Sequence, residues 1–154
     1  MNITYVSTRN NNDRVTPSQA ILNGLSNDGG LYVPDSIPAL DHKLLEYAVM
    51  DYKTTAYEIM KLFLTDFTED ELKACIDGAY DDKFDTKDIA PIHKADGAYF
   101  LELFHGKTIA FKDMALSILP YLMTTAAKKN NVDDEILILT ATSGDTGKAA
   151  LEGF

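Results

Sequence analysis

Apolar residues recur at steps of three and four along residues 111–126, which is the spacing of one buried helix face. The apolar positions are Phe111, Met114, Ala115, Ile118, Leu119, Leu122, Met123 and Ala126. Pro120 lies inside this pattern and should kink the predicted helix. Lys112 therefore falls where a loop turns into the first turn of a helix.

Two apolar runs on either side of this helix have the length of strands. Residues 98–104, AYFLELF, follow an Asp96-Gly97 pair that predicts a hairpin turn. Residues 135–141, EILILTA, form the continuous run typical of a strand buried on both faces of a parallel sheet. Strand, helix and strand in this order predict a right-handed βαβ unit.

The first half of the chain is predicted to be mostly helical. Three helix starts carry a capping box, in which Ser or Thr and a later Glu or Gln bind each other's backbone N–H groups. The boxes pair Thr16 with Gln19, Thr55 with Glu58 and Thr68 with Glu71. We therefore predict an α/β protein, with a mostly helical α+β domain over residues 1–92 and the start of a parallel βαβ sheet over residues 93–154.

Charge and composition exclude several classes of partner. The formal net charge of −10, from 24 acidic and 14 basic residues, argues against nucleic acid or an anionic membrane. The single cysteine, Cys75, cannot form an internal disulfide, and His42, His93 and His105 lack a metal-ligand spacing. The amino terminus is polar and no segment reaches membrane-spanning length. These features predict a protein of the reducing cytoplasm without a metal.

Lys112 is the first candidate for chemistry. The partial positive charge of a helix start and the apolar neighbours Ile109 and Phe111 both favour the neutral amine. The neutral amine is the form that attacks carbonyl groups to make a Schiff base. The alternative is a solvated lysine at a helix start, with Asp113 supplying the favourable negative charge.

The loop TSGDTG at residues 142–147 is the second candidate. A glycine-rich loop between a parallel strand and a helix directs backbone N–H groups and the hydroxyls of Ser143 and Thr146 toward one anion. The alternative is an ordinary tight turn with Ser143 or Asp145 as the helix cap. In a βαβ unit, Lys112 and this loop would lie at the same edge of the sheet and line one crevice.

The segments LELFHGKTIAFKD and ATSGDTGKAALEGF resemble the threonine synthase family, pyridoxal-phosphate enzymes of the tryptophan-synthase-β-like fold, also called fold type II. The stretches STR and LNGLSNDGGLYVPDSIP resemble the N-terminal domain of that family. The resemblance runs along essentially the whole chain. One position departs from it, because the frequent HGPT is HGKT here, with Lys107 in place of proline.

The resemblance implies a role for each matching residue. Lys112 would bind pyridoxal 5′-phosphate covalently and act as acid and base, and Asp145 would lie beside the phenolic oxygen of the cofactor. The substrate carboxylate would be held by the loop residues Ser143, Gly144, Thr146 and Gly147. His105 and Thr108 are second-rank candidates for substrate contacts. The implied reaction converts O-phospho-L-homoserine and water to L-threonine and phosphate.

The family's glycine-rich phosphate loop is not found in these 154 residues, so we expect the amino-terminal part of a longer enzyme, which is inactive alone and can self-associate. Two alternatives remain open. One is a related pyridoxal-phosphate enzyme, such as threonine dehydratase, cysteine synthase or a phosphothreonine lyase-like protein. The other is a non-catalytic domain that mediates protein contacts.

Overall fold

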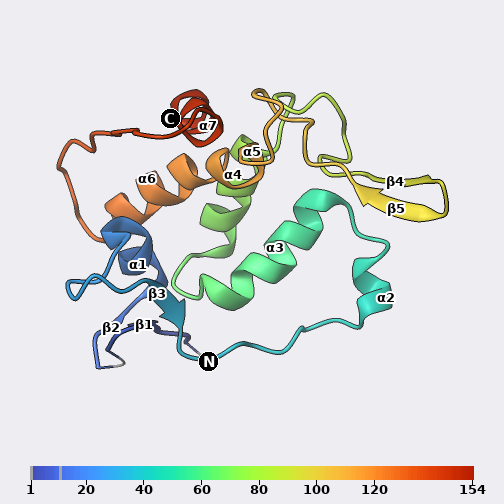
Figure 1. Cartoon of the computed structure of the whole chain (residues 1–154). Helices are drawn as coiled ribbons and strands as arrows, with labels where there is room; N and C mark the ends of the chain where they lie inside the picture. The colour runs from blue at the N-terminus through green and yellow to red at the C-terminus, as the bar shows by residue number, and fades with distance from the viewer. Residues whose placement is uncertain (1, 11) are drawn as a thin grey trace.

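The computed structural model describes residues 2–10 and 12–154 (Figure 1). Helices and short strands alternate along the chain. Their order is β1 (Tyr5–Ser7), β2 (Arg14–Val15), α1 (Pro17–Asn23), β3 (Tyr32–Pro34), α2 (Leu44–Tyr47), α3 (Tyr52–Phe63), α4 (Glu69–Ala79), β4 (Ile92–Ala95), β5 (Ala98–Leu101), α5 (Asp113–Leu116), α6 (Leu119–Lys129) and α7 (Asp145–Gly153).

The N-terminal strands form a small antiparallel sheet in the order β2-β1-β3. Strand β1 lies in the centre, and Val6 pairs with Arg14 on one side and with Val33 on the other. The Ser7 hydroxyl donates a 2.7 Å hydrogen bond to Asp28, which fastens the turn before β3 to the central strand. The sheet lies at one end of the helical body (Figure 1).

Two of the three predicted capping boxes are confirmed. The Thr16 and Thr68 side chains accept hydrogen bonds from the backbone N–H groups of the third residues of α1 and α4. The box at Thr55 is wrong, because α3 begins at Tyr52 and the Asp51 carboxylate accepts a 2.7 Å bond from the Thr54 N–H. Aspartate is a strong N-cap, so the helix begins at this earlier residue.

One hydrophobic core joins the two halves of the chain. Its buried members are Leu64, Phe67, Leu72, Cys75, Ile76, Ala79, Tyr80, Phe84, Ile89, Ile118, Leu122 and Ala126. Helix α4 and helix α6 each contribute one face to this core, as their apolar spacing predicts. The core crosses residue 92, and the division into domains 1–92 and 93–154 stays a prediction.

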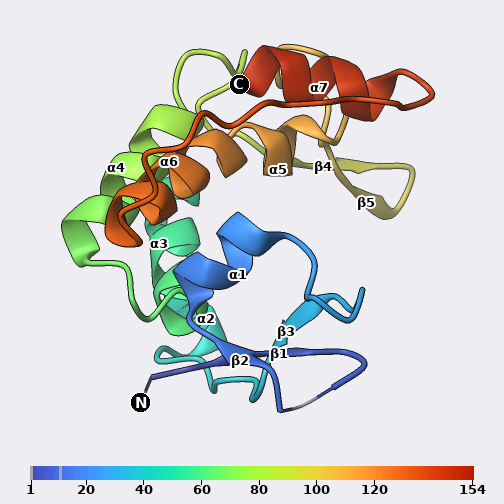
Figure 2. The same ribbon diagram turned by 90° about the vertical axis from the view of Figure 1, so that its left-hand side faces the viewer.

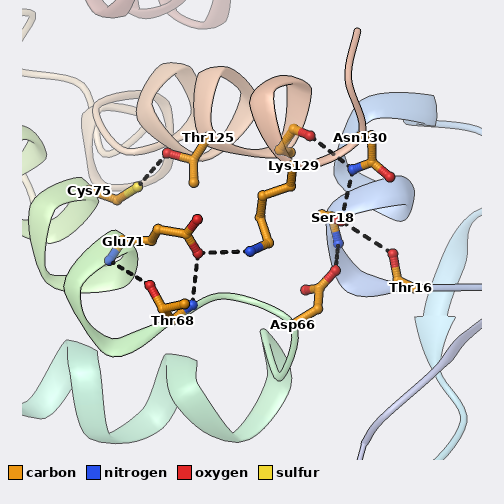
Figure 3. A network of polar contacts seen from close by, with 10 residues as sticks. Thr16, Ser18, Asp66, Thr68, Glu71, Cys75, Thr125, Lys129 and Asn130 are labelled. Carbon is orange, nitrogen blue, oxygen red and sulfur yellow. Dashed lines mark hydrogen bonds and ion pairs between the residues drawn. The ribbon is translucent and has the colours of Figure 1, made fainter.

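A polar network reinforces the junction of α1, α4 and α6 (Figure 3). Lys129 forms a 2.9 Å ion pair with Glu71, and the Asn130 amide donates a 2.9 Å hydrogen bond to the Ser18 hydroxyl. Cys75 is buried beside Thr125, and its burial raises the pKa of the thiol. A thiol with a raised pKa is a structural residue rather than a nucleophile.

The predicted hairpin turn is confirmed, and the single helix predicted over residues 111–126 with a kink at Pro120 is divided into two helices. Strands β4 and β5 pair antiparallel across a turn in which Asp96 and Gly97 have φ of 49° and 79°. The hairpin projects from the body of the molecule (Figure 1). Pro120 lies in the first turn of α6, and a separate one-turn helix, α5, precedes it.

Within the described residues, segment 135–141 is not paired as the predicted strand, and no parallel partner for it lies among them. This segment runs from α6 to α7 as an unpaired stretch (Figure 2), and Leu137 and Leu139 are 77% and 84% exposed. A parallel strand obtains its hydrogen bonds from a neighbouring strand. In the described part of the chain, both sheets are antiparallel and neither includes these residues. The helices and strands are those of a mixed α/β protein.

Candidate active site around Lys112

Lys112 lies at the N-terminal boundary of α5 and is half-buried. Its carbonyl accepts hydrogen bonds from the N–H groups of Ala115 at 3.2 Å and Leu116 at 2.9 Å, so its backbone already belongs to the helical turn. The Nζ atom lies 4.5 Å from the centroid of the Phe111 ring. A lysine ammonium over an aromatic face is attracted to the ring quadrupole, which keeps the side chain close to the protein surface.

The Lys112 side chain lines an open hollow of about 500 Å³. The hollow is lined by Tyr52, Ala90, Leu101, Leu103, Phe111, Lys112, Met114 and Ala115. These residues come from the start of α3, the loop before β4, the end of β5, the loop between β5 and α5, and α5 itself. Lys112 is the one charged member of this wall, so the hollow combines apolar surface for a flat ring with a single nucleophilic nitrogen.

The N-terminal helices support one side of this hollow. The rings of Tyr52 and Tyr80 pack edge to face, with centroids 4.8 Å apart and planes at 72°. Aromatic pairs in edge-to-face geometry contribute about 0.5–1.5 kcal/mol beyond the area they bury. Helices α3 and α4 therefore help to shape the surroundings of Lys112, which the sequence pattern alone did not suggest.

His105 is held between two carboxylates. Its ring nitrogens bind Glu102 at 2.9 Å and Asp85 at 2.5 Å. The hydrogen bond to Glu102, followed by that to Asp85, raises the pKa of the imidazole. Both ring nitrogens are thus engaged within the chain, and a contact between His105 and a substrate stays a prediction.

The glycine-rich loop is organised by a residue that the sequence did not single out. The Thr142 hydroxyl accepts hydrogen bonds from the N–H groups of Gly144 at 3.2 Å and Gly147 at 2.9 Å. Gly147 is buried, and a Cβ atom on it would lie 2.7 Å from this hydroxyl. Thr142 is a candidate helix cap by residue type, but its spacing of five residues to Gly147 is not a standard capping pattern.

The side chains predicted to bind an anion are exposed on this loop. Helix α7 begins at Asp145, and Gly144 precedes it with φ of 138°, a conformation that favours glycine. Ser143, Asp145 and Thr146 are all exposed. They are accessible to a ligand, and their assignment to substrate or cofactor stays a prediction.

The two candidate loops are connected through Thr108 and α7. The Lys148 ammonium in the first half of α7 donates a 3.4 Å hydrogen bond to the Thr108 carbonyl, and α7 packs against α5 (Figure 2). Residues 143–147 are not part of the wall of the Lys112 hollow, and no hydrogen bond between described residues joins them to the Lys112 side chain. The shared crevice therefore stays a prediction.

Two further features bear on the chemistry. Within the described residues, no group of three or more His, Cys, Asp or Glu side chains is arranged to hold a metal ion. Among the helices of that same part of the chain, none has the length and apolar character needed to cross a membrane.

Lys107, which stands where the family frequently has proline, is exposed and does not contribute to the wall around Lys112.

Comparison with protein families decides the relationship. Residues 4–80, half of the chain, match the family model described as "Threonine synthase N terminus". This chain belongs to the threonine synthase family. The match covers the N-terminal sheet and helices α1 to α4, while Lys112 and the glycine-rich loop lie beyond it.

Relatives and solved structures extend the likeness to the whole chain. Threonine synthase from Schizosaccharomyces pombe is 37% identical across 99% of the chain, and a threonine synthase-like 2 protein from Pongo abelii is 35% identical across 96%. The crystal structure of threonine synthase with bound PLP from Brucella melitensis superposes with a TM-score of 0.87 at 32% identity, across 99% of the chain. The chain spans about a third of the length of these proteins, at 31% of each relative and 33% of the structure.

Proposed function

We propose that this chain carries the cofactor-binding lysine of a threonine synthase, a carbon–oxygen lyase acting on phosphate. The reaction converts O-phospho-L-homoserine and water to L-threonine and phosphate. The observation that carries the proposal is the half-buried Lys112 amine in the wall of a largely apolar hollow of about 500 Å³. The solved relative from Brucella melitensis is described as PLP bound, which supports pyridoxal 5′-phosphate as the cofactor.

The residues around Lys112 fit this group. The hollow has apolar walls from Leu101, Leu103 and Met114 that suit an aromatic ring, and Lys112 offers the amine that reacts with an aldehyde. When bound, pyridoxal phosphate supplies an electron sink for the negative charge that develops on the substrate carbon. Lys112 Nζ is the atom that would hold the cofactor and move protons as acid and base.

The glycine-rich loop supplies the other proposed contacts. The exposed residues Ser143 and Thr146, with the N–H groups at the start of α7, would bind the substrate carboxylate. Asp145 would lie beside the phenolic oxygen of the cofactor. Because Thr142 already holds the N–H groups of Gly144 and Gly147, these two glycines would shape the loop rather than donate to the substrate.

A labelling experiment tests the proposal on the chain itself. The protein is incubated with pyridoxal phosphate, reduced with borohydride, digested and analysed by mass spectrometry. We expect the reduced adduct on Lys112 in preference to the exposed Lys107, and we expect Lys112→Ala to lose it. Lys107→Ala is the matched control and should retain the Lys112 adduct. Equal labelling of Lys107 and Lys112 would contradict the proposal.

A second candidate activity is favoured by the likeness to the threonine synthase-like 2 protein from Pongo abelii. In that case the enzyme would act on phosphorylated threonine as a lyase. The enzyme that contains this sequence is given O-phospho-L-homoserine or phosphothreonine, and the organic products are identified. Threonine formed from phosphohomoserine supports the first proposal, whereas a keto acid formed from phosphothreonine supports the second.

The unpaired segment 135–141 suggests how the 154 residues behave by themselves. Residues 135–141 expose Leu137 and Leu139 and make no backbone hydrogen bond to other described residues. Exposed apolar segments with free backbone groups pair with other chains. We therefore propose self-association and negligible phosphate release by this chain alone, in a cytoplasmic setting. Phosphate release from phosphohomoserine by the purified 154 residues would contradict the proposed lack of activity.

A further inference from the structure

The residue that follows Lys112 carries a buried charge. Asp113 is 4% exposed, and both of its carboxylate oxygens are bound by one residue. The Thr108 N–H donates a 2.8 Å hydrogen bond to Oδ2, and the Thr108 hydroxyl donates a 2.6 Å bond to Oδ1. Thr108 is itself 7% exposed, so the pair is shielded from water. A buried carboxylate is stable only with such partners.

The loop before Lys112 is folded directly onto this carboxylate. Gly106 is buried, and a Cβ atom on it would lie 2.5 Å from the Cβ atom and from Oδ2 of Asp113. Real Cβ atoms do not approach other atoms so closely, so the contact requires glycine at this position. Gly106, Thr108 and Asp113 therefore form one closed unit, the Asp113 clamp.

The clamp holds a backbone conformation that its residues do not prefer. Ile109, between Thr108 and Lys112, has φ of 63°, which is unfavourable for a β-branched residue. Its side chain is 71% exposed and makes no compensating buried packing. Strained conformations of this kind persist only where the surrounding structure fixes them. Two sets of contacts fix it here: the double hydrogen bond from Thr108 to Asp113 and the 3.1 Å bond from the Ile109 N–H to the Gly106 carbonyl.

We infer that Asp113 is a positioning residue for Lys112, acting through Thr108 and the loop 106–111. The clamp fixes the chain before Lys112, and the hydrogen bonds from Ala115 and Leu116 fix it afterwards. Because the backbone is fixed on both sides of Lys112, the Cα atom from which its side chain extends has one position on the wall of the hollow. This inference rests on the proposed role of Lys112 in binding a carbonyl compound.

The test compares labelling of two lysines in the same molecule. Wild type, Asp113→Asn, Thr108→Ser and Thr108→Val are treated with pyridoxal phosphate across a range of pH, reduced with borohydride and mapped. Asparagine offers one acceptor oxygen in place of two, so the ratio of Lys112 to Lys107 adduct should fall roughly tenfold in Asp113→Asn. Thr108→Ser keeps both donors and should retain the wild-type ratio, and Thr108→Val should lie between the two.

Amide hydrogen exchange provides a readout that does not depend on the cofactor. Amide exchange at residues 108–112 should accelerate at least about tenfold in Asp113→Asn, because the pair of hydrogen bonds from Thr108 to the carboxylate is lost. Asp134→Asn, at an exposed acidic position, is the matched control and should match wild type in both measurements. If Asp113→Asn does not fold, Thr108→Val, which removes one of the two bonds, decides the question.

The outcomes separate this inference from the proposed function. No preference for Lys112 in the wild-type protein would overturn the proposed function, whatever the variants do. A wild-type preference for Lys112 that survives unchanged in folded Asp113→Asn, or in Thr108→Val, would overturn the positioning role alone. Accelerated exchange with an unchanged labelling ratio would also overturn it, because Asp113 would then stabilise the loop without directing Lys112.

Discussion

The Tyr80 hydroxyl donates a 2.8 Å hydrogen bond to the Met114 carbonyl, which joins the end of α4 to the one-turn helix that follows Lys112. Tyr80 is 5% exposed, and its burial strongly raises the pKa of the phenol, so the group remains a donor. The bond spans 34 positions in the sequence. The part of the chain that matches the N-terminal family model thus supports the lysine that lies outside it.

Removing this hydroxyl should destabilise the protein without changing its core. Tyr80→Phe keeps the aromatic packing against Tyr52 but leaves the Met114 carbonyl without its donor, which should cost about 1 kcal/mol. The measurement is urea unfolding followed by circular dichroism. Tyr99→Phe, at an exposed position on β5, is the control and should change the free energy of unfolding by less than about 0.5 kcal/mol. Equal losses of unfolding free energy in the two variants would contradict a stabilising role for the hydrogen bond from Tyr80 to Met114.

The shared core predicts that its central residues matter to the whole chain. Leu72 is 1% exposed in α4, so Leu72→Ala should lower the free energy of unfolding by about 2–5 kcal/mol. Leu137→Ala, at a position that is 77% exposed, removes the same atoms and should have little effect. Thermal unfolding of both variants checks this difference. Two separate unfolding transitions in wild type would argue against a single core.

Stability should fall as the pH rises through the titration of two histidines. The hydrogen bond that His105 donates to Glu102 raises the pKa of its imidazole, and the one that His42 donates to Glu46 raises the pKa of that ring. The unfolded value is about 6.5, so the protonated rings stabilise the fold fully below that pH. This contribution is lost as the pH rises through the higher folded pKa.

Urea unfolding from about pH 5.5 to about pH 8.5 measures this effect. His42→Asn and His105→Asn should each flatten the decline in stability over this range, and the double variant should flatten it most. A double variant whose stability falls in parallel with wild type would show that other groups cause the decline. The comparison uses differences between variants at each pH, so the general effect of pH on the chain cancels.

The start of α7 should depend on Thr142. Thr142→Val removes the oxygen that accepts from the N–H groups of Gly144 and Gly147, which should cost about 0.5–2 kcal/mol of local stability. Hydrogen exchange at the Gly147 amide reports this loss directly. Ser143→Ala changes the exposed neighbour and should leave the exchange rate unchanged. Equal acceleration in both variants would mean that the Thr142 hydroxyl does not fix the start of α7.

Self-association should depend on the uncovered segment 135–141. The double variant Leu137→Lys with Leu139→Lys should shift sedimentation toward the monomer, because charge opposes strand pairing. The matched control is Leu44→Lys with Leu45→Lys, which changes an equally exposed apolar pair on α2. If the control variant lowers association as much, exposed apolar surface in general, rather than segment 135–141, would cause the self-association.

Local signals in the sequence predicted several elements correctly. These elements depend on residues within a few positions of each other: the capping boxes at Thr16 and Thr68 and the Asp96-Gly97 turn. The error at Thr55 arose because Asp51, a stronger cap four positions earlier, also lay in range. The choice of Lys112 as the candidate nucleophile also came from the sequence, through its apolar neighbours and the motif it shares with the family.

Only the tertiary structure decided what surrounds these residues. Three contacts depend on how loops and helices fold onto one another: the bonds from Thr108 to Asp113, the bond from the Gly147 N–H to Thr142, and the bond from Tyr80 to Met114. The failure of 135–141 to form a strand has the same origin. The apolar composition of segment 135–141 predicted burial. A strand, however, obtains its backbone hydrogen bonds from a neighbouring strand, and the described residues place no strand beside this segment.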